Sequence, residues 1–226
     1  MKSLREYQME NESRNIIWDW NGTLVDDVEL CIEIMNSFLH ERHLPLLNIE
    51  RYRDVFDFPV IDYYKKLGFD FNVDPFEVIG LEFMKKFLDR IEEVPLMKDA
   101  VDILEWFSQQ GYRQYILSAM EEKALIRMLT EKGIYHYFEA ISGISNHYAG
   151  GKLEEGQHFM IQNNIKPNKT FLIGDTVHDF EVGNLLGIKV ILITHGHQSK
   201  QRLLETQALV VDNFEQVKNW FIQMDK

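Results

Sequence analysis

The sequence feature that most constrains the fold is a strict alternation of helical and strand patterns over residues 95–226. Short apolar runs that fit strands are separated by amphipathic stretches with helical spacing, several of which end at a glycine. The predicted strands are 112–117, 138–141, 170–173, 189–193 and 209–211, and the predicted helices are 99–110, 121–132, 153–164, 179–186 and one through residues 217–221. Such alternation is typical of a parallel sheet with helices on both faces. The expected fold class is therefore α/β, with a Rossmann-like, doubly wound parallel sheet.

Residues 28–93 interrupt this alternation, because they contain helical patterns and no run of strands. One helix is predicted over 28–40, a short one ends at Gly68, and another extends from Pro75 to about Ile91. This segment indicates an all-helical insertion. The expected domains are a core of residues 1–27 and 94–226 and an inserted α-helical domain of residues 28–93.

The first strand of the sheet belongs to the most informative stretch, IIWDWNGTLVDD at residues 16–27. Its apolar run predicts a buried strand that ends at Asp19, and the following Asn21-Gly22-Thr23 is typical of a turn. The Asp19 carboxylate would then lie at the carboxyl end of the strand, where ligands bind in open α/β sheets. Asp26 and Asp27 precede the first predicted helix, and we expect a carboxylate there to cap its N-terminus.

Composition and charge limit the class of protein. Hydrophobic residues make up 45% and charged residues 27%, as in ordinary globular domains, and no apolar run reaches membrane-spanning length. The polar opening stretch does not resemble a signal or transit peptide. A net charge of −12 argues against nucleic acid or an anionic membrane as partner, and the single cysteine excludes an internal disulfide. We expect a cytoplasmic protein that is a monomer or a homodimer.

Four motifs carry a resemblance to a known family. Residues 19–26 (DWNGTLVD) resemble the first motif of the haloacid dehalogenase superfamily of phosphohydrolases, Asp-x-Asp-Gly-Thr, with Asn21 in place of the second Asp. Three further matches follow in the family's order: Ser118 at a strand end, Lys152 before a helix, and the Gly-Asp-x-x-x-Asp pattern of Asp175 and Asp179. The resemblance extends from about residue 16 to the last strand, and four matches in order argue against coincidence. It implies that the insertion is a C1-type helical cap, as in phosphoglycolate phosphatase-like members.

The resemblance also implies an activity and a set of roles. The chain would be a Mg²⁺-dependent phosphatase that hydrolyses a small phosphorylated metabolite, such as phosphoglycolate or a sugar phosphate, through an aspartyl-phosphate on Asp19. The implied metal ligands are Asp19, the backbone carbonyl of Asn21, Asp175 and Asp179. The implied phosphate-binding residues are Ser118, Ala119, Lys152 and Gly22. A dehalogenase needs no metal, so the carboxylate pair argues against that alternative, whereas a phosphomutase stays open.

Asn21 stands where the family has its general acid/base, and an amide can neither give nor take that proton. Such a loss typically costs about 10²- to 10⁴-fold in rate, most of all for alkyl phosphates. One alternative is an active phosphatase in which a cap residue, a water or one of His147, His178 and His195 replaces the acid. The others are a slow phosphatase limited to activated leaving groups, or a phosphate-binding or regulatory protein with little turnover. The intact nucleophile and charged residues weigh against the last.

Several other side chains have candidate positions. Trp18 and Trp20 are expected to pack in the core on the pleat face opposite Asp19. His195 and His197 follow the strand at 189–193 and should lie near the rim of the cleft. Arg51 and Arg53 in the insertion could bind a second anionic group of the substrate, although a solvated surface role is the simpler interpretation.

Overall fold

The computed structural model describes residues 14–144 and 152–224 of the chain. Its centre is a six-stranded parallel sheet with the strand order β3-β2-β1-β4-β5-β6. The strands are β1 (Asn15–Trp18), β2 (Arg113–Glu121), β3 (Phe138–Ile144), β4 (Thr170–Gly174), β5 (Lys189–Ile193) and β6 (Leu209–Val211). The predicted α/β fold with a doubly wound parallel sheet is therefore confirmed.

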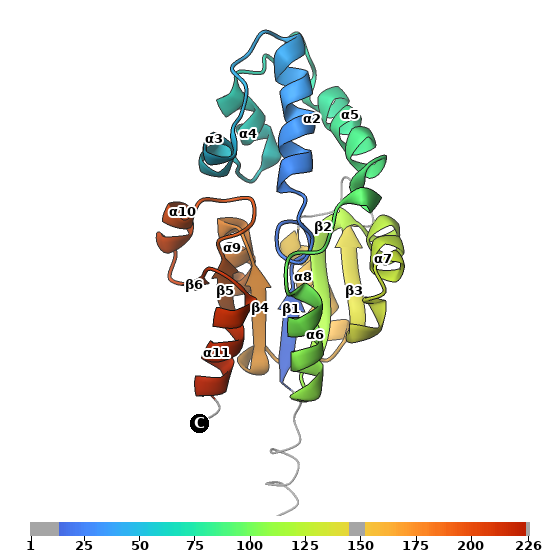
Figure 1. The fold of residues 1–226 in the computed structure, drawn as a ribbon, viewed down its shortest axis with the longest axis vertical. Coiled ribbons are helices and arrows are strands. Elements are labelled where there is room, and N and C mark those ends of the chain that lie inside the picture. Colours follow the sequence, from blue (N-terminus) through green and yellow to red (C-terminus); the bar gives the residue numbers. More distant parts are fainter. Residues whose placement is uncertain (1–13, 145–151, 225–226) are drawn as a thin grey trace, which may run out of the picture.

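Helices cover both faces of this sheet, and alternate side chains of the central strand point to each face. Ile16 and Trp18 of β1 pack in one buried cluster with Phe107 and Phe221, whereas Ile17 packs in a second cluster with Phe159. The helices of the first layer are α6 (Ala100–Gln109), α7 (Glu122–Glu131) and α11 (Phe214–Met224), and those of the second are α8 (Lys152–Gln162) and α9 (Val177–Leu185). A short helix α10 (Lys200–Leu204) lies beside β6 (Figure 1).

The segment between β1 and α6 forms four helices above the carboxyl ends of the strands (Figure 1). They are α2 (Val28–Glu41), α3 (Ile49–Val55), α4 (Val60–Leu67) and α5 (Phe76–Leu88), followed by a 3₁₀ turn at Ile91–Glu93. These are the helices expected for the insertion, with α3 added. The division into a core and a cap domain at residues 28 and 93 stays a prediction. No helix in the described ranges is both long and apolar enough to cross a membrane.

Some elements differ from the sequence-based expectation. β2 and β3 extend to Glu121 and Ile144, three or four residues beyond the predicted ends, and their pairing shifts register after Leu117. Helices α3 and α10 were not predicted, because each is short and is held by contacts to distant segments. Trp18 and Trp20 are fully buried, as expected.

Candidate active site at the carboxyl end of the sheet

Three strands deliver the candidate catalytic side chains to one place. Asp19 follows β1, Ser118 lies on β2 and Asp175 follows β4, and parallel strands bring their carboxyl ends to the same edge of the sheet. The backbone N–H of Asp19 donates to the carbonyl of Ile173 (2.9 Å), so β1 and β4 stay paired up to the site. Asp19, Asn21, Ser118, Ala119, Asp175 and Asp179 all line a single cavity of about 660 Å³.

The carboxylates of Asp19, Asp175 and Asp179 form a buried acidic cluster. One carboxylate oxygen of each lies within 4.8 Å of the others. The hydroxyl of Thr23 bridges two of them, at 2.9 Å from Asp175 Oδ1 and 3.3 Å from Asp19 Oδ2. Burial raises the pKa of Asp175 to about 7, and the charges of Asp19 and Asp179 add to the rise while His197 opposes it. Three converging carboxylates under this repulsion suit a divalent cation, and oxygen donors are the ligands that Mg²⁺ prefers.

Asp179 is held in place by its own turn. Its Oδ2 accepts hydrogen bonds from the backbone N–H groups of Asp175 (3.2 Å) and Thr176 (3.0 Å) and from the Thr176 hydroxyl (2.7 Å). Thr176 in turn accepts from the N–H of Asp179, which completes a capping box at the start of α9. The residue is thus both a helix cap and a member of the acidic cluster.

Two glycines pack directly against Asp175 and fix its carboxylate. Gly22 has a positive φ of 71°, and a Cβ there would lie 2.5 Å from Asp175 Oδ2 and from the His197 ring. At Gly196 a Cβ would lie 2.1 Å from the same oxygen. The backbone N–H of His197 donates to Asp175 Oδ2 (2.7 Å). A side chain at either glycine would therefore push the carboxylate out of the cluster.

Asp27 does not cap α2, so that prediction is wrong. Its carboxylate turns back toward the first turn, where Oδ1 accepts from the Gly22 N–H and Oδ2 from the Asn21 side-chain nitrogen, both at 2.8 Å. Oδ1 also lies 3.2 Å from Nε2 of His197. These three donors hold the carboxylate away from α2, so it makes no hydrogen bond to the first N–H groups of that helix. The backbone N–H of Gly22 is thus bound to Asp27, and the phosphate-binding role implied for Gly22 stays a prediction.

The Asp27 carboxylate begins a buried chain of hydrogen bonds. His197 pairs with it through Nε2, and Nδ1 of the same ring lies 2.8 Å from the Tyr52 hydroxyl on α3. Burial alone would lower the pKa of His197, but the charge and hydrogen bond of Asp27 raise it to about 9. The pKa of Asp27 is lowered despite its burial, because His197, Asn21 and Gly22 stabilise the charged form. Both ring nitrogens of His197 are thus engaged.

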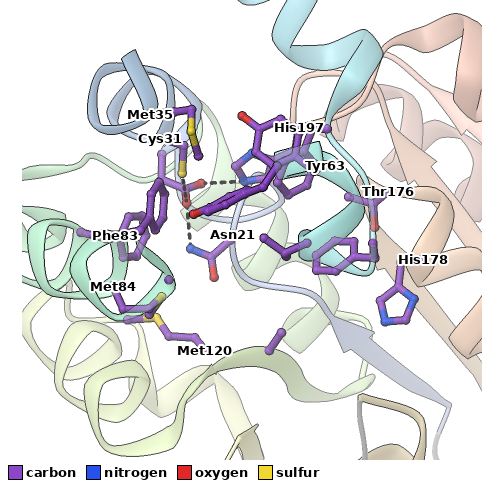
Figure 2. A pocket seen from close by; sticks show the side chains of 18 of the residues that line it. Asn21, Cys31, Met35, Tyr63, Phe83, Met84, Met120, Thr176, His178 and His197 are labelled. Atoms are coloured by element: carbon purple, nitrogen blue, oxygen red, sulfur yellow. Dashed lines mark hydrogen bonds and ion pairs between the residues drawn. The ribbon is translucent and has the colours of Figure 1, made fainter. Parts of the chain in front are cut away.

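The contact with Asp27 sets the orientation of Asn21. An ionised carboxylate only accepts hydrogen bonds, so the amide nitrogen of Asn21 must face it. Figure 2 shows this nitrogen on the dashed line and the amide oxygen pointing the other way, into the cavity. Residue 21 therefore presents a hydrogen-bond acceptor to a bound ligand.

The remaining candidates are histidines, arginines of the insertion, and two residues whose side chains are not described. His178 lines the cavity and stacks on Phe58, with ring centroids 4.8 Å apart. His195 lies with Nε2 3.2 Å from the carbonyl of Thr23. Arg51 and Arg53 bind backbone carbonyls of residues 45–46 and 195–196 and are not among the residues that line the cavity. Lys152 is the first residue of α8, but its side chain, like all of His147, lies outside the described part of the structure.

Sequence reasoning did not find the partnership of Asp27 with Asn21 and His197. Asp27 and His197 are 170 positions apart, and a helix-cap role explained Asp27 locally. Gly196 carried a weak signal, since a glycine between two histidines just after a strand is compatible with close backbone approach.

Fold and site together define an α/β protein with an aspartate cluster at the carboxyl end of its sheet and a helical insertion above it. The chain belongs to the haloacid dehalogenase-like hydrolases, because the model of that family matches residues 16–193, more than half of the sequence. The predicted family is thus confirmed.

Named relatives and solved structures agree with this assignment. The chain is 24% identical over 221 residues to a phosphoglycolate phosphatase of Nitrosococcus oceani, covering 92% of this chain and 96% of that protein. It is 23% identical to phosphoglycolate phosphatase 1 of Pseudomonas aeruginosa, covering 88% and 76%. Among solved structures, the haloacid dehalogenase-like protein SP0104 from Streptococcus pneumoniae has a TM-score of 0.76 at 23% identity, covering 92% and 98%. A predicted phosphatase from Clostridium acetobutylicum has a TM-score of 0.78 at 18% identity, covering 94% and 100%.

Proposed function

We propose that this protein is a Mg²⁺-dependent phosphatase that hydrolyses a small-molecule phosphomonoester through an aspartyl-phosphate on Asp19. The observation that carries the proposal is the buried cluster of Asp19, Asp175 and Asp179 at the wall of an accessible cavity. The relatives named phosphoglycolate phosphatase support it and make phosphoglycolate the first metabolite to test.

Residues of this chain, together with the metal they would hold, would prepare the attack. Asp19 offers a carboxylate oxygen as nucleophile at the sheet edge, and the Thr23 hydroxyl between Asp19 and Asp175 fixes its orientation. Asp19, Asp175, Asp179 and the backbone carbonyl of Asn21 would hold Mg²⁺, whose charge would cancel the repulsion between carboxylate and phosphate. The buried hydroxyl of Ser118, together with Ala119 and Lys152, would bind the phosphoryl oxygens.

Asn21 limits the second half of the cycle. Its amide oxygen can accept a hydrogen bond from the attacking water and so orient it, but it takes no proton. Release of phosphate from Asp19 should therefore be slow unless His178 or His195, which lie at or near the cavity, replaces the base. This observation also favours the second candidate function, a phosphate-binding or regulatory protein with little turnover.

The helices α2–α5 would serve as the cap of this site. They lie above the acidic cluster, and residues from α2, α3, α4 and α5 line the cavity. A cap in this position would exclude water during attack and select the leaving group. The cytoplasmic location and the monomeric or homodimeric state stay predictions.

Acetyl phosphate hydrolysis tests the proposal, because this substrate is activated and needs no protonation of its leaving group. We expect hydrolysis that requires Mg²⁺ and is abolished in Asp19→Asn. Intact-protein mass spectrometry of the reacting protein should show an aspartyl-phosphate adduct that Asp19→Asn lacks. The exposed Asp54→Asn is the matched control, since it makes the same change on α3 away from the cavity. Binding of phosphate without any adduct or turnover would instead establish the second candidate.

A further inference from the structure

Beyond the acidic cluster, the cavity changes character. It continues between the sheet and helices α2, α4 and α5, and its walls there are aromatic and methionine side chains (Figure 2). Those labelled in the figure are Met35, Tyr63, Phe83, Met84 and Met120, and Phe76 also lines the cavity. Aromatic rings and flexible thioethers favour an apolar, planar guest. The group attached to the phosphate therefore enters an apolar compartment.

The described part of these walls offers no cation to a second anion. Among the described residues that line the cavity there is no lysine or arginine. Of the two imidazoles, His197 is engaged at both nitrogens, and His178 has Nδ1 3.5 Å from Glu181. Glu77 adds a negative charge to the wall. A substrate carboxylate would lose its hydration here without gaining a cation, which is strongly unfavourable.

Residue 21 constrains the leaving group independently. The amide oxygen of Asn21 faces the cavity and carries no proton, so the departing oxygen leaves as an anion. A phenol-type oxygen, with a pKa of about 10 as in tyrosine, tolerates this. An alkoxide is far more basic and needs the acid that is missing.

We propose that the substrate is the phosphate monoester of a small phenol-type alcohol, with an uncharged aromatic ring in the apolar compartment. This rests on the proposed phosphatase function and names its substrate class. In the first step an Asp19 oxygen bonds to phosphorus as the bond from phosphorus to the aryl oxygen breaks. The phenolate leaves with the electron pair and is protonated by solvent. In the second step water attacks the aspartyl-phosphate, giving inorganic phosphate and the free carboxylate.

The decisive comparison uses phenyl phosphate, cyclohexyl phosphate and 2-phosphoglycolate on the full chain with Mg²⁺. Phenyl and cyclohexyl esters have similar shapes, so their ratio isolates the leaving group, whereas phosphoglycolate tests the second anion. We expect kcat/KM for phenyl phosphate to exceed both others by at least about 10²-fold. A rate for phosphoglycolate or cyclohexyl phosphate equal to that for phenyl phosphate would overturn the proposal. So would a preference for phosphocholine, whose cation could also suit aromatic and acidic walls.

Gly80 on α5 provides a variant of the compartment itself. It lines the cavity, and a Cβ there would meet no atom within 4 Å. Gly80→Trp should fill the space. We expect kcat/KM for phenyl phosphate, divided by kcat/KM for acetyl phosphate, to fall by at least about tenfold. Gly80→Ala adds one methyl group and should keep the ratio within about twofold, because a methyl leaves most of the apolar wall unchanged. An unchanged ratio in Gly80→Trp would place the ring elsewhere and overturn the proposal.

Failure of the phosphatase function is distinguishable from failure of this inference. If acetyl phosphate is not hydrolysed, the hydrolytic function fails, but ligand preference can still be measured by calorimetry with non-hydrolysable phosphonates. Benzylphosphonate, the analogue of phenyl phosphate, should then bind at least about tenfold more tightly than 3-phosphonopropionate, the analogue of phosphoglycolate. The reverse order would overturn the substrate class whatever the catalytic outcome.

Discussion

At the scale of single residues, the contact between Asn21 and Asp27 decides which chemistry position 21 can perform. The amide donates to a carboxylate that is 1% exposed, already accepts from Gly22 and pairs with His197. In the family's first motif an aspartate stands at the position of Asn21. Here the carboxylate next to that position belongs to Asp27 instead. A variant that simply restores the aspartate therefore places two carboxylates against each other.

Asn21→Asp should accordingly destabilise the protein. A half-buried carboxylate at position 21 and the buried one of Asp27, at the present 2.8 Å separation, cannot both ionise without cost, so we expect the free energy of unfolding at pH 7 to fall by about 1–3 kcal/mol. The double variant Asn21→Asp/Asp27→Asn restores one donor and one acceptor and should recover most of that loss. Urea unfolding of the parent, both single variants and the double variant measures the coupling. Additive effects of the two substitutions would contradict this account.

Gly196 shows how closely the backbone packs on the acidic cluster. Gly196→Ala would place its Cβ against the Asp175 carboxylate, so we expect the dissociation constant for Mg²⁺ to rise by roughly 10- to 100-fold, as for other supports of metal ligands. Calorimetric titration with Mg²⁺ measures it. Gly80→Ala is the control, since its methyl group enters open space. Equal Mg²⁺ affinity in the two variants would show that Asp175 can move without loss.

At the scale of elements, helix α3 is fastened to the loop between β5 and α10. Arg53 donates to the carbonyls of His195 and Gly196, and its own carbonyl accepts from the N–H of Ser199. The carbonyl of Phe56, just after α3, accepts from the side chains of Gln198 and Arg202. The loop that positions His197 is thus bonded to the helical insertion as well as to the sheet, and any motion of the insertion must carry this loop with it or break these bonds.

An ion pair in this contact makes a pH-dependent contribution. Asp57 pairs with Lys66 (2.7 Å) and Arg202 (3.0 Å), and although partial burial opposes ionisation, these cations lower its pKa below the usual value of 3.8. The stabilisation is therefore complete above pH 3.8 and is lost as the pH falls through the lower pKa of the folded state. Because Asp57 and both cations stay partly exposed to water, which screens their attraction, we expect at most about 1 kcal/mol.

The measurement is the difference in unfolding free energy between the parent and Asp57→Asn from pH 3 to 6. We expect a constant difference at the upper end that shrinks below pH 3.8. Asp54→Asn, which makes the same change at an exposed position outside this ion pair, should show no such trend. If the difference in unfolding free energy grew as the pH fell, the folded state would raise the pKa of Asp57 and this account would be wrong.

These contacts also explain what could be predicted from the sequence. Long periodic helices such as α2 and α6, and the apolar strands β4 and β5, were predicted nearly to the residue because their own patterns specify them. Helices α3 and α10 have seven and five residues and depend on each other's segments, so no local pattern reveals them. The family resemblance implied that Asp19 and Asp175 bind the same metal, and the parallel strands that precede them do bring their carboxylates together. The partners of Asp27 were missed because its position just before a predicted helix suggested a capping role.

At the scale of the whole molecule, the parallel sheet collects negative charge in a protein that already has a net charge of −12. The sheet fixes Asp19 and Asp175, the first turn of α9 fixes Asp179, and hydrogen bonds from Thr23, His197 and Thr176 hold the three carboxylates together. The folded state therefore includes a repulsion that a bound cation relieves, so metal binding should appear in the stability of the entire chain.

Mg²⁺ should raise the melting temperature. A ligand that binds only the folded state at 100 times its dissociation constant adds about 2.7 kcal/mol, or roughly 5–10 °C for a chain of this size. Asp175→Asn should melt higher than the parent in EDTA, because one buried charge is gone, and should lose most of the increase with Mg²⁺. Asp54→Asn makes the same charge change at an exposed site and should keep the full increase. If Mg²⁺ stabilised Asp175→Asn as much as the parent, the cation would bind elsewhere, and the roles assigned to all three aspartates would fall together.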